Sequence, residues 1–347
     1  MSNPVVAVAL SGGIDSLVSG FLVKQSYKKV FGIHFTTGYE ASPVDTKALE
    51  EQLGFKVHTI NLANAFEQKV VDYFISTYLS GQTPNPCVVC NQQIKFGALL
   101  SSALKLGADV LATGHYATII NSYTFPDKKI HGAWLEKGED PKKDQSYFLA
   151  RLGSEQLDKI IFPLATATKT QVKIIAETNS LVPSVPSESQ DICFIPDKSH
   201  ADFITGKTGQ LPKPGDVKDM SGKVVGTHNG LHTFTIGQRR GINIPASEPY
   251  YVRSIDMATN TLHVCFKKDL SQKQMKVSQI IWNYPEVTEI SNLTTKIRYS
   301  HKGAVSTLIK DGDRGEVIFE APQNAVTPGQ AAVFYLENRV LGAGIIQ

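Results

Sequence analysis

The segment from residue 9 to residue 16 constrains the fold of this chain more than any other feature. It reads Ala-Leu-Ser-Gly-Gly-Ile-Asp-Ser and joins the apolar run Pro4–Val8 to the amphipathic stretch Leu17–Gln25. A strand, a tight Gly-Gly turn and a helix start bring several backbone N–H groups together at the positive end of a helix. The sequence therefore predicts an anion site at the end of the first strand.

Strand and helix patterns alternate through the first third of the chain. Strands are expected at residues 4–10, 29–35, 56–62 and 108–113, and helices at 17–25, 42–54, 66–81 and 94–106. Ser42 is expected to cap the second helix, with Pro43 as its first residue. Such alternation predicts a doubly wound parallel sheet, whose ligands bind beyond the carboxyl ends of the strands. The segment 9–16 would lie there.

The remainder of the chain follows other patterns. A β-hairpin is expected over 117–135, and residues 198–244, rich in Gly, Pro and Lys, suggest a small irregular domain. Beyond Pro249 the chain is almost entirely strand-like, which favours a small antiparallel barrel or sandwich. We therefore predict an α/β domain at 1–197, a small central domain at 198–249 and an antiparallel β-barrel domain at 250–347.

Composition limits the environment and the partners of the chain. A net charge of +3 over 347 residues means that any contact with nucleic acid must come from local basic patches. Only four cysteines are present, which suits a reducing cytoplasm, where a Cys-x-x-Cys pair is catalytic or metal-binding more often than disulfide-bonded. No apolar run approaches the roughly 20 residues of a membrane span, and no signal peptide is recognisable. The expected location is cytoplasmic, without a membrane partner.

The 9–16 loop lacks two common nucleotide motifs. It has no P-loop lysine and no Gly-x-Gly-x-x-Gly fingerprint. It resembles instead the pyrophosphate loop of enzymes that cleave ATP between the α and β phosphates, so the fold is expected to be similar to that of the adenine nucleotide hydrolases.

Two further motifs contain cysteine. Cys87 and Cys90 lie in Thr83-Pro84-Asn85-Pro86-Cys87-Val88-Val89-Cys90-Asn91, where two prolines stiffen the chain. Asn91 could cap a following helix, and the positive helix end would then lower the thiol pKa of Cys90. Cys193 stands alone in Ser189-Gln190-Asp191-Ile192-Cys193-Phe194.

Taken together, these motifs resemble those of the tRNA-specific 2-thiouridylases over nearly the whole chain. The matching stretches are Ser11–Ser16, Thr83–Gly97, Ala112–Tyr116, Lys143–Leu149, Ser189–Ile195, Thr235–Gly241 and Val326–Tyr335. The resemblance implies that ATP, with Mg²⁺, adenylates the C2 oxygen of the wobble uridine in certain tRNAs. Sulfur then displaces AMP and leaves 2-thiouridine. The sulfur would come from a donor protein or from inorganic sulfide.

The resemblance also implies roles for individual residues. Cys193 would carry sulfur as a persulfide, and Cys90 would be the nucleophile that releases it, through a disulfide with Cys193. The phosphates would be held by Ala9, Leu10, Ser11, Gly12, Gly13, Ile14, Asp15 and Ser16, and the adenosine by Phe35 and Gly114. Contacts with tRNA would involve His115, Lys143, Asp144, Gln145, Arg298, Tyr299 and Gln330, and contacts with the target base Asn85, Pro86 and Cys87.

One residue departs from the family pattern. Many relatives have aspartate where this chain has Cys87, which adds a third thiol near Cys90 and Cys193. Three thiolates with one open position can hold an iron–sulfur cluster that binds hydrosulfide, so a cluster on these cysteines is an alternative to the persulfide. A zinc site is a further alternative, which His115 or His200 would have to complete.

Other readings of the whole chain stay open. An amide ligase of the ATP-pyrophosphatase class would share the loop but has no use for three placed cysteines. A non-catalytic tRNA-binding iron–sulfur protein would not need an intact phosphate loop. Gln238-Arg239-Arg240-Gly241 is either a solvated loop or a surface that contacts phosphate.

Overall fold

The computed structural model describes residues 4–40, 42–125, 128–185, 192–195, 199–285 and 287–347. Two compact units are present. The first comprises Met1–Val70, Cys87–Phe194 and Asn338–Leu341, and the second comprises Val71–Pro86, Ile195–Glu337 and Gly342–Gln347. Each unit is described by itself below.

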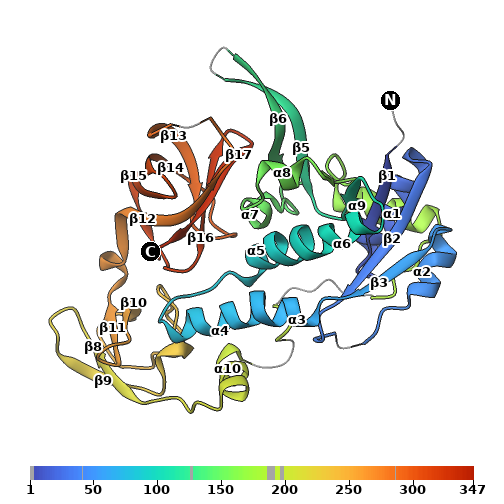
Figure 1. The fold of residues 1–347 in the computed structure, drawn as a ribbon. Coiled ribbons are helices and arrows are strands. Elements are labelled where there is room, and N and C mark those ends of the chain that lie inside the picture. Colours follow the sequence, from blue (N-terminus) through green and yellow to red (C-terminus); the bar gives the residue numbers. More distant parts are fainter. Residues whose placement is uncertain (1–3, 41, 126–127, 186–191, 196–198, 286) are drawn as a thin grey trace. The chain divides into compact units, whose positions relative to one another are not determined.

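A five-stranded parallel sheet forms the centre of the first unit (Figure 1). Its order is β3-β2-β1-β4-β7, made of Val57–Asn61, Lys29–Thr36, Val5–Ala9, Val110–Ala112 and Ile160–Ile161. The central strand β1 pairs with β2 from Val5↔Lys29 to Ala9↔Ile33. Val6, Ala7 and Val8 are completely buried, as expected of a strand covered on both faces. The predicted parallel sheet is confirmed.

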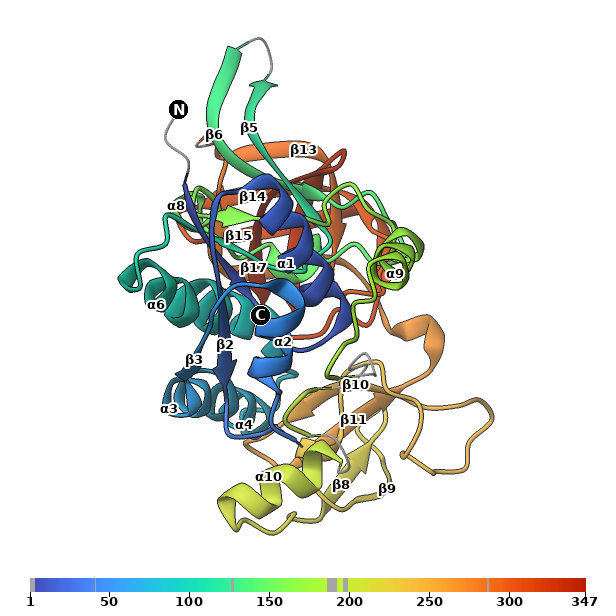
Figure 2. The ribbon, with the colours of Figure 1, turned by 90° about the vertical axis from the view of Figure 1, so that its right-hand side faces the viewer.

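Helices α1 (Ile14–Ser26), α2 (Thr46–Leu53) and α9 (Lys169–Thr178) pack together beside this sheet (Figure 2). Their apolar faces enclose a core with the strands, to which Leu17, Leu53 and Val172 contribute. The predicted start of α2 is wrong. Asp45, not Ser42, is the N-cap, because its carboxylate accepts hydrogen bonds from the backbone N–H groups of Lys47 and Ala48.

The helical stretch that carries two of the cysteines runs without a break from Pro86 to Lys105. It consists of α5 (Pro86–Cys90), a π-helical segment (Asn91–Leu99) and α6 (Leu100–Lys105). Asn91 therefore lies inside the helix, and the prediction that it caps the helix is wrong. The first helical residue is Pro86, whose fixed φ and missing N–H suit that position.

A second helical stretch also contains a π-helical segment. It runs through α3 (Ala63–Phe66), the π-helical Glu67–Val71 and α4 (Asp72–Leu79). The first unit is completed by the hairpin of β5 (Ala117–Phe125) and β6 (Lys128–Lys137) and by the short helices α7 (Ser146–Leu149) and α8 (Ser154–Leu157). The hairpin strands run side by side in both ribbon views (Figures 1 and 2).

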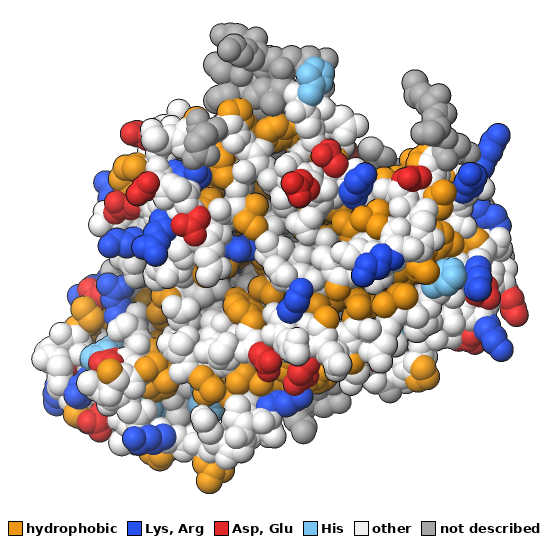
Figure 3. All heavy atoms as spheres, viewed as in Figure 1, with side chains coloured by type: hydrophobic (Ala, Val, Ile, Leu, Met, Phe, Trp, Pro, Cys, Tyr) orange, Lys and Arg blue, Asp and Glu red, His pale blue; other side chains and the backbone are white. Residues whose placement is uncertain are grey.

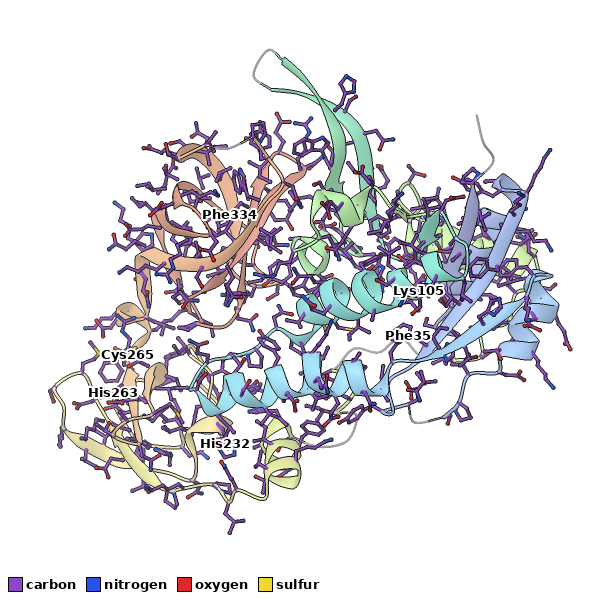
Figure 4. All side chains as sticks on the ribbon, viewed as in Figure 1. Phe35, Lys105, His232, His263, Cys265 and Phe334 are labelled. Atoms are coloured by element: carbon purple, nitrogen blue, oxygen red, sulfur yellow. The ribbon has the colours of Figure 1, made fainter. Side chains whose placement is uncertain are left out.

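The second unit contains a small four-stranded sheet of order β10-β11-β8-β9. These strands are Tyr251–Asp256, Thr261–Cys265, Gly215–Lys218 and Val224–His228, and helix α10 (His200–Thr208) precedes them. Val217, Val252 and Leu262 contribute to the core of this sheet. Cys265 is buried at the end of β11 (Figure 4).

Six antiparallel strands close into a barrel in the C-terminal part. They are β12 (Ser271–Trp282), β15 (Arg314–Asn324), β14 (Ala304–Asp311), β13 (Glu289–Lys296), β16 (Ala331–Leu336) and β17 (Arg339–Ile346), in that order. Pairing of β12 with β17 closes the barrel, and Phe334 is completely buried (Figure 4). The predicted fold class, a parallel-sheet domain followed by a small central domain and a β-barrel, is confirmed. The domain boundaries at 197/198 and 249/250 remain predictions.

The surface carries charges of both signs. On the face drawn in Figure 3, basic and acidic side chains are interspersed, in keeping with the net charge of +3. Among the described residues, no helix has both the length and the apolar character needed to cross a membrane.

Candidate functional site

The predicted phosphate loop is held in shape by its own two serines. The Ser16 hydroxyl donates to the Gly13 carbonyl at 2.8 Å and accepts from the Ser11 backbone N–H at 3.2 Å. Gly12 has a φ of +82°, a backbone conformation that glycine adopts without strain. At the start of the loop, the Leu10 carbonyl lies 2.8 Å from Nδ1 of the buried His34 ring. The loop is therefore preorganised.

The space above Gly13 is open. A Cβ atom built at Gly13 would have the Ser11 Oγ, at 3.6 Å, as its nearest neighbour. Gly13 is also the N-cap of α1, so the free N–H groups of the first helical turn point towards the same region. This hollow beside several backbone donors fits a phosphate group.

Gly114 is pressed against this loop from the end of β4. A Cβ there would lie 2.8 Å from the Asp15 carbonyl carbon and 2.9 Å from the Ser16 nitrogen. Phe35 is half-buried near the end of β2 (Figure 4). Both predicted adenosine contacts thus lie at the carboxyl edge of the parallel sheet, where β1 leads into the loop.

Two residues that the sequence analysis missed hold Asp15. The Lys169 ammonium lies 2.7 Å from Oδ1 and 2.8 Å from Oδ2 of Asp15. The Tyr116 hydroxyl donates to Oδ1 at 2.6 Å. Neither residue could be found from a local motif, because Lys169 is 154 positions and Tyr116 is 101 positions from Asp15.

The first unit contains three of the four cysteines as free thiols. Cys87 and Cys193 are exposed, and Cys90 is partly buried. The protein atoms around the sulfurs nevertheless displace part of their hydration, and this desolvation raises the pKa of all three thiols, that of Cys90 to about 12. Mutual repulsion also raises the pKa values of Cys90 and Cys193, so the three thiols lie within electrostatic reach of one another. The prediction that the helix end lowers the pKa of Cys90 is wrong.

Lys95 is the cation that opposes this effect. Its charge lowers the pKa of Cys87, Cys90 and Cys193, although burial outweighs it at each thiol. Lys95 Nζ lies 3.4 Å from His115 Nε2, and His115 Nδ1 lies 2.8 Å from the Thr113 hydroxyl. Burial, followed by the charge of Lys95, holds the pKa of His115 well below its usual value, so the ring is neutral.

The residue after Cys193 anchors its loop. Phe194 is 3% exposed and packs its ring 5.8 Å from that of Tyr39 and 5.7 Å from that of Phe66. The Tyr39 hydroxyl in turn donates to Glu67 at 2.5 Å. This aromatic cluster fixes the backbone beside Cys193. Ser189, Gln190 and Asp191 of the same motif lie outside the described residues.

The side chains proposed for an iron–sulfur cluster or a zinc site are not arranged as metal ligands in the described residues. Within the described part of the chain, no three His, Cys, Asp or Glu side chains are arranged to hold a metal ion. His115 already uses both ring nitrogens, and His200 contacts the His232 carbonyl at 3.1 Å. The three thiols suit iron in their chemistry but do not converge as ligands in this structure.

The predicted tRNA contacts of the first unit have structural partners. Asp144 Oδ1 accepts from the backbone N–H groups of Gly138 and Ser146 at 3.1 and 3.0 Å. Gln145 bonds the Tyr116 backbone twice, once through its side chain and once through its N–H. Because Tyr116 follows His115, this places the segment Lys143–Gln145 next to His115.

The predicted tRNA contacts of the second unit fall into two groups. Arg298 and the exposed Tyr299 lie just beyond β13, where the Lys296 ammonium is 5.7 Å from the centre of the Tyr299 ring. Arg239 and Arg240 are also exposed. Gln330 instead donates to the carbonyls of Thr83 and Pro84, at 3.1 and 2.9 Å. It therefore holds the segment that leads into Asn85 and Pro86.

Comparison with known proteins follows the three parts of the fold. Residues 4–197 match the family described as tRNA methyl transferase HUP domain. Residues 201–266 match the tRNA methyl transferase PRC-barrel domain, and residues 272–346 the aminomethyltransferase beta-barrel domain.

Relatives that align over the full length of the chain identify its family more specifically than the three domain matches do. The tRNA-specific 2-thiouridylase MnmA of Desulfosudis oleivorans is 48% identical, over 100% of this chain and 96% of its own length. That of Desulfotalea psychrophila is 38% identical over 100% of both chains. Among solved structures, the U34-tRNA thiolase NcsA from Methanococcus maripaludis with its [4Fe-4S] cluster gives a TM-score of 0.36 at 21% identity, over 60% of this chain and 67% of that chain. On its identity with full-length relatives, the chain belongs to the tRNA-specific 2-thiouridylase family.

Proposed function

We propose that the protein thiolates the wobble uridine of tRNA at C2 in a reaction that consumes ATP. The observation that carries this proposal is the presence in one unit of an open phosphate loop and three free thiols near a lysine. An amide ligase would have a use for the loop only, and a non-catalytic tRNA-binding iron–sulfur protein would have a use for the thiols only. Family membership supports the same conclusion.

The first step activates the base. The uridine O2 attacks the α-phosphorus of ATP, a bond forms between them, and the bond to the β-phosphate oxygen breaks to release pyrophosphate. The donors at Gly12–Asp15 would hold the leaving group, and Mg²⁺, when bound, would supply further positive charge there. Phe35 and Gly114 would bound the adenosine.

The second step transfers sulfur. A sulfur-donor protein that itself carries a persulfide would pass its outer sulfur to the Cys193 thiolate, and the donor's thiolate would leave. The terminal sulfur of the Cys193 persulfide then attacks C2, and AMP leaves. The Cys90 thiolate then attacks Cys193 Sγ, the bond from Cys193 to the transferred sulfur breaks, and a Cys90–Cys193 disulfide remains. Before the next turnover, an external thiol reductant must supply two electrons to reduce this disulfide to the two thiols.

The raised pKa of Cys90 suits this order of events. A thiol is a poor nucleophile while it is protonated, so the pKa of about 12 keeps Cys90 from discharging the persulfide early. Lys95 is the charge that would stabilise the thiolate when it forms. The iron–sulfur alternative would use Cys87, Cys90 and Cys193 as ligands and would need the backbone to bring them together. Iron and acid-labile sulfide analysis of anaerobically prepared protein tests that alternative.

Contact with tRNA would come from the exposed basic and aromatic residues. Arg298, Tyr299 and the Arg239–Arg240 pair are suited to phosphates and unstacked bases. The neutral His115, whose ring nitrogens contact Lys95 and Thr113, would turn towards the tRNA only by giving up one of these contacts, and Lys143 would add a cation beside it.

The products formed from ATP test the proposal. With unmodified tRNA, the wild-type protein should form AMP and pyrophosphate, and formation should depend on the tRNA. Cys193→Ser should still release pyrophosphate but transfer no sulfur, because adenylation precedes the thiol chemistry. Formation of ADP and phosphate, or of AMP without any need for tRNA, would contradict the proposal.

A further inference from the structure

An ion pair between the buried Lys169 and the partly buried Asp15 lies beside the phosphate loop. Lys169 is 9% exposed and is the first residue of α9, so its side chain crosses to Asp15 in the first turn of α1. Both carboxylate oxygens of Asp15 lie within 2.8 Å of the Lys169 ammonium. The Lys169 backbone N–H donates to Asp140 Oδ2 at 3.0 Å, which fixes the start of α9.

This arrangement is costly for α9 alone. A lysine at the first position of a helix faces the positive end of the helix dipole. Burial of a long charged side chain also costs conformational entropy and hydration. An apolar residue would pack α9 equally well. The charge of Lys169 must therefore be explained by the group that its ammonium contacts.

That group is the Asp15 carboxylate, whose negative charge lies beside the expected phosphate site. The carboxylate lies two residues beyond Gly13, next to the donors that would hold phosphate. An unbalanced carboxylate there would repel the phosphates of ATP, because two like charges about 6 Å apart interact by roughly 3 kcal/mol at an effective dielectric constant of 20. Lys169 balances the charge of Asp15, while Tyr116 fixes the direction of the carboxylate.

We propose that Lys169 is a positioning residue of the nucleotide site, which acts through Asp15 and keeps the empty loop receptive to the pyrophosphate part of ATP. This inference rests on the proposed use of ATP. When Mg²⁺ arrives with the nucleotide, Asp15 has a second cation available to it, so the need for Lys169 should be greatest without metal.

Binding of inorganic pyrophosphate to the full chain, measured by calorimetry in buffer with EDTA, tests the inference. Lys169→Met should bind pyrophosphate about 10- to 100-fold more weakly than wild type, as expected for one unbalanced charge at this range. Lys169→Arg should keep most of the affinity. Lys173→Met is the matched control, because it removes an exposed lysine one turn further along α9.

The double variant Asp15→Asn/Lys169→Met shows whether Lys169 acts through Asp15 or contacts the phosphates itself. It removes both charges with side chains of similar size and keeps the backbone N–H of residue 15, which is the group of Asp15 that would hold phosphate. It should therefore fold even if the single variant does not, and it should bind pyrophosphate within about threefold of wild type. Affinity as low as that of Lys169→Met, or far below wild type, would overturn the inference and indicate that Lys169 contacts the phosphates itself. Wild-type affinity in Lys169→Met would also overturn it.

Failure of the proposed function would look different. In that case the wild-type chain would bind neither pyrophosphate nor Mg·ATP. Binding by the wild type that is insensitive to these charges would leave the use of ATP intact and remove only the role of Lys169.

Discussion

Gly13, in the phosphate loop, and Gly114, which lies against that loop, give opposite predictions for the same added methyl group. Gly114→Ala should lower the stability of the first unit, because the new Cβ meets backbone atoms of Asp15 and Ser16 at 2.8–2.9 Å. These atoms cannot move without displacing the start of α1. The expected cost is that of overpacking, about 1–3 kcal/mol.

Gly13→Ala should leave stability within about 1 kcal/mol of wild type. Its φ of −82° is open to alanine, and the nearest heavy atom to the new Cβ is 3.6 Å away. A gain from the less flexible unfolded chain opposes the small preference of glycine over alanine at an N-cap. The methyl group would nevertheless occupy the space proposed for phosphate, so affinity for ATP should fall at least about tenfold, by roughly 1.4 kcal/mol or more.

The assay pairs thermal unfolding of each variant with calorimetric titration of Mg·ATP. Gly107→Ala is not a suitable control because Gly107 has a φ of +93°, whereas Gly153→Ala adds a methyl group in open space elsewhere in the first unit. If Gly13→Ala binds Mg·ATP as tightly as wild type, the hollow above Gly13 is not the phosphate site. If Gly114→Ala unfolds at the wild-type temperature, Gly114 is not packed tightly against the start of α1.

Other predictions concern the thiols and their supports. Alkylation of Cys90, followed by peptide mass spectrometry, should keep accelerating as pH rises beyond 9, because burial raises its pKa to about 12; a plateau near pH 9 would contradict this. Lys95→Met should slow alkylation of Cys90 at pH 8, since the lysine charge lowers the pKa of that thiol, and an unchanged rate would exclude the effect. Phe194→Ala should cost about 3–5 kcal/mol and increase the rate at which the exposed Cys193 reacts with bulky maleimides, because the Phe194 ring anchors the loop; an unchanged rate would refute this role. Gln330→Ala should increase proteolysis near residues 83–84, whose carbonyls it bonds, and equal cleavage would refute this role.

The sequence was sufficient for those features that depend on local patterns. The buried runs around Val6–Val8 and the regular alternation of strand and helix predicted the parallel sheet, and the glycine turn predicted the loop. Local signals also misled where two of them competed. Ser42 and Asp45 are both good caps, and the chain uses the one nearer the first buried residue of the helix, Leu49.

The missed features depend on contacts between distant parts of the chain. Lys169 and Tyr116 reach Asp15 only through the fold, and nothing near either residue signals a partner. The direction of the Cys90 pKa shift was predicted from a helix end, but burial and neighbouring thiols decide it. Asn91 continues the helix because Pro86 has already begun it.

The central claim is that ATP cleavage drives the transfer of sulfur to a tRNA base. Its most direct test is incubation of anaerobically prepared protein with unmodified tRNA, Mg·ATP, a thiol reductant and a low-molecular-weight persulfide whose outer sulfur is isotopically labelled, followed by mass spectrometry of the digested nucleosides. The account predicts labelled 2-thiouridine at the wobble position with wild type, and none without ATP or with Cys193→Ser. Labelled 2-thiouridine formed without ATP, or formed undiminished by Cys193→Ser, would contradict it.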